Sequence, residues 1–118
     1  MTTLFEKLGG RPAVNAAVDI FYGKIREDDS ISHLFANTDM PKQIAKQKVF
    51  LTYAFGGSPN YSGKSMRDAH KHLTLTEDHF NAVAGHLKST LQELDVPDDL
   101  QDEVMSIAAS THDDVLNL

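Results

Sequence analysis

Apolar residues recur every three or four positions along most of this chain, and no stretch alternates apolar and polar residues for long enough to indicate a β-strand. The segment from about residue 12 to 27 shows the pattern well, because Val14, Val18, Tyr22 and Ile25 share one helical face. The same spacing predicts further helices over 3–8, 40–55, 64–73, 76–94 and 97–115. We therefore expect an all-α fold, either an antiparallel bundle or a globin-like crossed arrangement, since periodicity does not distinguish the two.

Residues typical of helix ends divide these segments. Gly9 is expected to end the first helix, and Ser30 to cap a short turn that follows the second. Asp39, Thr76 and Pro97 stand where three later helices should begin. The boundaries are thus marked by local chemistry as well as by periodicity.

Composition argues against several classes of partner. The chain of 118 residues is long enough for one small core, and we expect a single domain over 1–118. Its net charge is −6 without a block of Lys or Arg, which disfavours nucleic-acid binding. No apolar run approaches the roughly 20 residues of a membrane span, and the start MTTLFEKLGG lacks a signal-peptide layout. A cytoplasmic monomer with no nucleic-acid or membrane partner is the expectation.

Polar side chains interrupt the apolar faces of three predicted helices. Tyr22 lies on the buried face of the second helix, Gln43 and Gln47 lie one turn apart on that of the helix over 40–55, and His70 faces inward on the short helix over 64–73. Each has an ordinary explanation, such as a half-exposed amide or a hydrogen-bonded core histidine. Together on so short a chain, they suggest that these four side chains surround one polar group that is not protein.

The chemistry of these residues suits a haem better than a bare metal ion. The chain has no Cys, so thiolate sites and thioether haem attachment are excluded. The histidines show no spacing typical of zinc, and His70 and His72 face different sides of a helix. A haem iron needs only one imidazole, while hydroxyl and amide donors can stabilise a bound gas.

Several sequence fragments resemble the group I truncated haemoglobins, especially cyanobacterial and green-algal members. These fragments are LFEKLGG, the pair Phe21-Tyr22, HLFANTDM, the helix from Gln43 to Gln47 leading into FLTYAFGG, MRDAHKHL and DVLN. They occur in the family's order over nearly the whole chain. The resemblance implies a two-over-two helical sandwich with one b-type haem.

The resemblance also assigns roles to individual residues. His70 becomes the proximal ligand of the iron, and Tyr22, Gln43 and Gln47 become the distal hydrogen-bonding cluster. The expected haem contacts are apolar: Phe35, Phe50, Leu51, Met66, Phe80 and Val83. These are also plausible core residues, which leaves the two explanations open for each.

Two positions leave alternatives open. Lys46 stands where some relatives have a histidine or lysine that binds the iron as distal ligand, although a lysine stem can instead cross the haem edge to solvent. Relatives that link a histidine of the last helix to the haem have it at the position of Thr111, whereas this chain has His112 one residue later. One residue is about 100° of helix rotation, so the covalent link is doubtful and His112 is expected at the surface.

The resemblance implies a protein that binds O2, NO and CO. The first hypothesis is nitric oxide dioxygenation, with Tyr22, Gln43 and Gln47 as catalytic residues and a separate reductase, since no flavin or nicotinamide motif is present. The second is a non-enzymatic protein that stores, delivers or senses oxygen. The third is a six-coordinate redox protein closed by Lys46.

Overall fold

The computed structural model describes residues 2–58, 61, 70, 75–116 and 118. Every regular element among them is helical, and no strand occurs in this part of the chain, so the all-α prediction is confirmed. The elements are α1 (Leu4–Leu8), α2 (Gly10–Glu27), η1 (Ser32–Phe35), α3 (Met40–Ala54), α5 (Glu77–Glu93), α6 (Asp98–Ser110) and α7 (His112–Leu116). None of these helices is both long enough and apolar enough to cross a membrane. The helix expected over 64–73 lies outside the described residues except for His70, which is helical.

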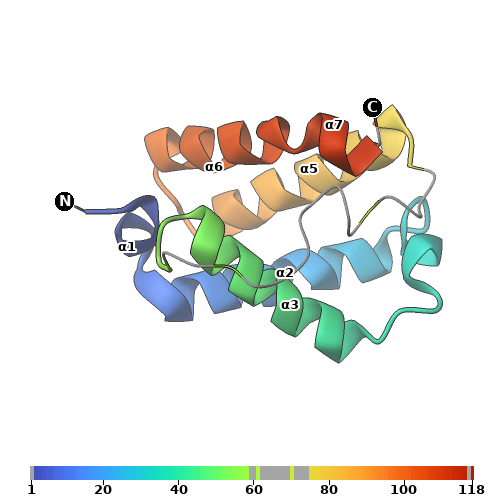
Figure 1. Ribbon diagram of the computed structural model, residues 1–118, viewed down its shortest axis with the longest axis horizontal. Helices are drawn as coiled ribbons and strands as arrows, with labels where there is room; N and C mark the ends of the chain where they lie inside the picture. The colour runs from blue at the N-terminus through green and yellow to red at the C-terminus, as the bar shows by residue number, and fades with distance from the viewer. Residues whose placement is uncertain (1, 59–60, 62–69, 71–74, 117) are drawn as a thin grey trace.

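Two pairs of helices lie one over the other (Figure 1). One layer holds α2 and α3, the other holds α5 and α6, and α2 contacts both α3 and α5. The short α1 reaches α6, and α7 packs back on α5. Of the two arrangements that the sequence left open, the structure therefore has the globin-like one.

The core lies between the layers. From α2 it takes Val14, Val18 and Ile25, each at most 2% exposed, and from the opposite layer it takes Leu91 and Val104. Full burial of an aliphatic side chain contributes about 1.5–3 kcal/mol, so this seam is a main source of stability. The apolar stripe that the sequence shows on the second helix is thus its buried face.

The spacing of Phe80, Val83, Leu87 and Leu91 also predicts that Leu94 lies on the buried face of α5, but Leu94 is 37% exposed. The helix ends at Glu93, and Asp95 then adopts a positive φ of 57°, which turns the chain toward α6. Leu94 therefore leaves the helical stripe that its spacing suggested.

The predicted helix ends are confirmed in four of five places. Gly9 ends α1 with a φ of 115°, a conformation that suits glycine. Asp39 caps α3, Pro97 precedes α6, and Thr76 caps α5 by accepting from the backbone of His79. Ser30 does not cap η1, because its hydroxyl and backbone N–H both donate to a carboxylate.

The N-terminal segment is fastened to the end of α3. The Phe5 N–H donates to the Phe55 carbonyl at 2.8 Å, and the Phe5 ring lies over Gly57. A Cβ atom built on Gly57 would stand 2.6 Å from that ring, so the close approach requires glycine.

Candidate functional site

Two of the polar residues singled out in the sequence meet between α2 and α3. Tyr22 is 4% exposed, and the Gln43 amide nitrogen donates to the Tyr22 hydroxyl oxygen at 3.4 Å. Burial raises the pKa of Tyr22, and the hydrogen bond from Gln43 lowers it by less, so the phenol keeps its proton at neutral pH. Its oxygen accepts from Gln43, and its own proton has no acceptor among the described residues.

Aromatic contacts fix the ring of Tyr22. Phe21 packs edge-on with the rings 5.3 Å apart, and Phe35 of η1 packs edge-on at 6.1 Å. Phe35 is thereby placed against the ring of Tyr22. Gln47 lies one turn beyond Gln43 on α3 and is half-buried.

The other apolar residues expected at the site are half-buried: Phe50, Leu51, Phe80 and Val83. Leu51 also lines an apolar cavity of about 150 Å³ with Phe21 and Leu87. Met66 lies outside the described residues. Four large apolar side chains from both layers are thus available to line a site between them.

His70 is half-buried and helical, but most of its neighbours in sequence lie outside the described residues. Lys46 is exposed on α3, whereas Gln43 and Gln47 are half-buried. The structure therefore brings Tyr22 together with Gln43.

Comparison with known proteins decides the family. The bacterial-like globin family matches residues 3–117. A group 1 truncated haemoglobin from Synechocystis is 54% identical over 99% of both chains. The chain belongs to the group 1 truncated haemoglobins. A Chlamydomonas moewusii member is 52% identical and covers 98% of this globin, which in turn covers 69% of that protein.

Solved structures agree with this assignment. The 2/2 haemoglobin of Synechococcus, described with covalently attached haem, superimposes with a TM-score of 0.95 at 51% identity, covering 98% of this globin and 99% of that chain. The truncated haemoglobin of Tetrahymena pyriformis gives a TM-score of 0.91 at 43% identity and 97% coverage of both chains. The two-over-two fold that the sequence fragments implied is therefore that of the solved relatives.

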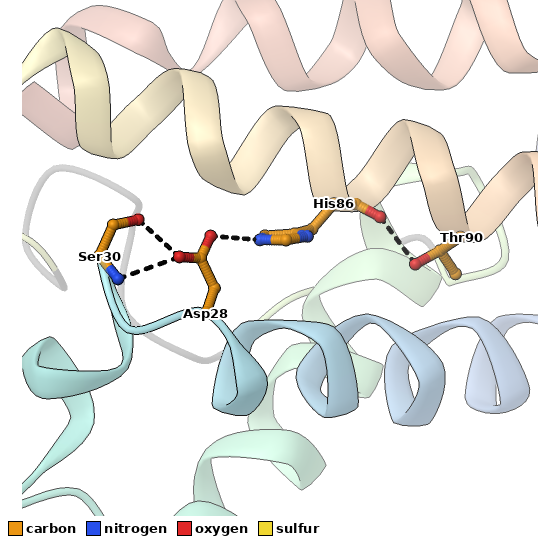
Figure 2. A network of polar contacts seen from close by, with 4 residues as sticks. All are labelled: Asp28, Ser30, His86 and Thr90. Carbon is orange, nitrogen blue, oxygen red and sulfur yellow. Dashed lines mark hydrogen bonds and ion pairs between the residues drawn. The ribbon is translucent and has the colours of Figure 1, made fainter.

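Sequence reasoning missed a polar network that joins the end of α2 to α5 (Figure 2). Asp28 ends α2, and its carboxylate accepts from the Ser30 hydroxyl at 2.6 Å and from the His86 ring nitrogen at 2.6 Å. Hydrogen bonds from Ser30 and His86 lower the pKa of Asp28 to about 2. The network ties the turn before η1, and hence the segment that carries Phe35, to α5.

The sequence contains a local signal for one of the two contacts of Asp28, the one with Ser30. An aspartate two residues before a serine is a common side-chain turn, so the bond from Ser30 to Asp28 could have been predicted. The bond from His86 could not, because 58 residues separate the partners.

His112 keeps contact with solvent, as expected, and also has aromatic and ionic partners. Its side chain is 28% exposed, and its ring packs edge-on against Phe80 at 5.0 Å. Its nitrogens lie 2.6 Å from Glu77 and 2.8 Å from Asp113, and these contacts raise the pKa of His112 above its ordinary 6.5. His112 thereby links α7 to the first turn of α5.

Proposed function

We propose that this globin holds one b-type haem through His70 and converts nitric oxide and dioxygen to nitrate. A haem iron accepts an imidazole on one side and a diatomic gas, O2, NO or CO, on the other. The donor set fits that chemistry, because it combines an imidazole, a buried phenol, two amides and apolar side chains. Phe35, Phe50, Leu51, Phe80 and Val83 are the proposed walls, together with Met66.

The buried hydroxyl of Tyr22 carries the proposal. A phenol that keeps its proton and already accepts from Gln43 is oriented to donate to a small ligand. Such a bond is worth about 1.5 kcal/mol or more when the acceptor carries negative charge, as dioxygen does on a ferrous haem. Tyr22 would hold dioxygen, and Gln43, with Gln47 beside it, would orient the hydroxyl.

Retention of dioxygen allows nitric oxide to react before the gas escapes. The balance is one nitric oxide, one dioxygen and one electron to one nitrate, so each turnover needs a one-electron donor. The sequence has no flavin or nicotinamide motif, so we assign the electron to a separate reductase in the cytoplasm.

Rapid mixing of the oxygen-saturated ferrous protein with nitric oxide tests this function. We expect stoichiometric nitrate and ferric protein within the mixing time. A matched variant, Tyr22→Phe, should lose dioxygen faster and give less nitrate when oxygen is scarce. If the nitric oxide is recovered unchanged and no nitrate forms, the proposed function is refuted and oxygen storage or sensing is favoured.

The alternative in which Lys46 closes the haem has its own spectroscopic test. A neutral amine is needed for ligation, so low-spin ferric bands should grow as the pH rises and be absent in Lys46→Ala. Because Lys46 is exposed on α3, ligation requires its side chain to turn inward. We therefore prefer the open site for the resting protein.

A further inference from the structure

The outward face of α3 carries a continuous stripe formed by Lys42, Lys46, Val49 and Tyr53, hereafter the α3 stripe. The four positions follow the i, i+4, i+7, i+11 spacing of one helical face, and all four side chains are exposed. They span about 17 Å along the helix. The stripe thus places two cations beside two apolar side chains.

The apolar half of the stripe is unusual for this molecule. Val49 is 60% exposed and Tyr53 41%, and few other large apolar side chains are as exposed in the described part of the chain. The ring of Tyr53 stacks on Tyr61, with the centroids 5.4 Å apart and the planes at 22°. A rigid apolar centre with a charged rim is the usual anatomy of a protein interface.

Charge is distributed unevenly between the two layers. Residues 75–118, which form α5, α6 and α7, contain ten acidic residues and one basic residue, Lys88. Residues 1–58, which form α1, α2 and α3, contain six acidic and seven basic residues, and α3 itself has no acidic residue. An acidic partner is therefore repelled by one layer and attracted by the other (Figure 1).

We propose that the α3 stripe is the docking surface for an acidic one-electron donor protein, of the iron–sulfur or flavin class. This rests on the proposed function, which requires such a donor. Gln43 and Gln47 are half-buried residues of the same helix, so a partner on the stripe would lie within about one helix diameter, 10–12 Å, of them. The donor would supply one electron to the haem that we propose His70 holds, and no bond would be made or broken.

The size of the stripe suits a transient partner. Redox encounters bury less than about 1,200 Å² in total, and a single helix face is adequate for that. Lys48 lies beside the stripe but is paired with Asp19 at 3.0 Å, whereas Lys42 and Lys46 have no ion-pair partner among the described residues. Docking through them should be fast, weak and strongly dependent on salt.

Charge reversal at matched lysines tests the proposal, with an acidic plant-type ferredoxin as the probe. Lys42→Glu alters the stripe, and Lys88→Glu makes the same change in net charge on the opposite layer. At about 0.01 M salt we expect Lys42→Glu to weaken ferredoxin binding roughly tenfold, measured by calorimetry, and to slow haem reduction by reduced ferredoxin to a similar extent. Near 1 M salt, where the Debye length is ~3 Å, the difference should vanish.

Further measurements separate docking from the proposed chemistry. Carbodiimide coupling of the parent to ferredoxin should give cross-links at Lys42 and Lys46 and not at Lys88, and Val49→Asp should weaken binding at both salt concentrations. Reduction by dithionite and nitrate formation by the pre-reduced protein should be equal in parent, Lys42→Glu and Lys88→Glu. If Lys88→Glu is as damaging as Lys42→Glu, or if the cross-links fall outside the stripe, the docking surface is wrong. Failure of all pre-reduced proteins to form nitrate would instead refute the proposed function. The calorimetry and the cross-links would still test the docking surface.

Discussion

Removal of the Tyr22 hydroxyl should accelerate oxygen release without disturbing the fold. Tyr22→Phe keeps the ring and its edge-on contacts with Phe21 and Phe35, and deletes only the oxygen. The bond lost within the protein is the one from Gln43, which at 3.4 Å is long for a hydrogen bond. The effect on the free energy of unfolding should therefore be below about 1 kcal/mol.

The effect on the bound gas should be much larger. One hydrogen bond to dioxygen worth about 1.5 kcal/mol corresponds to roughly a tenfold change in the release rate, since 1.36 kcal/mol is a factor of ten. The half-buried Gln43 can turn toward the ligand and replace part of the loss. Tenfold is therefore the expected central value.

Stopped-flow displacement of dioxygen by carbon monoxide measures this rate. Tyr53→Phe is the matched control, because it removes a tyrosine hydroxyl from an exposed position on α3. The control should release oxygen at the parental rate. Equal rates in Tyr22→Phe and the parent would show that the phenol does not donate to the ligand, and the argument from its burial would fail.

Three further predictions concern stability. In urea titrations, Gly57→Ala should lower the free energy of unfolding by about 1–3 kcal/mol, because the new Cβ overlaps a ring, whereas Gly23→Ala, with open space on α2, should raise it by about 0.5–1 kcal/mol. The pKa of Asp28 is about 2 and lies below the ordinary 3.8, so its stabilisation is complete above pH 3.8 and is lost as the pH falls through 2. The difference in free energy of unfolding between the parent and Asp28→Asn should shrink over that interval. A constant difference would contradict the network. The pKa of His112 is raised, so its stabilisation is complete below pH 6.5 and is lost as the pH rises through the folded-state pKa. The urea midpoints of the parent and Glu77→Gln should therefore converge with rising pH. A difference between the midpoints that widens would exclude the pairing of His112 with Glu77.

The helices could be predicted from the sequence because their determinants are local. Val14, Val18 and Ile25 mark the buried face of α2 by spacing alone, and Asp39 and Thr76 mark two helix starts by the chemistry of their side chains. The layer arrangement could not be derived from spacing. It depends on which faces meet, and it followed only from the order of family fragments along the chain.

The same distinction applies to the candidate site. Tyr22 and Gln43 were each recognisable as polar groups on apolar faces, and the structure brings them together. The bond between Asp28 and His86 joins two elements whose polar residues look like ordinary surface groups in the sequence. Such contacts depend on the distance between helices, which no local pattern specifies.

The two roles considered for Lys46 exclude one another. As part of the α3 stripe, Lys46 must be accessible to a partner, and it is exposed on α3. As an iron ligand it must be neutral and turned inward, so ligation would remove one of the two cations that remain for a partner and close the gas site at the same moment. A protein that alternated between these states would accept electrons poorly whenever its haem was closed. The pH titration of the ferric parent and of Lys46→Ala therefore also tests whether Lys46 is available to the partner.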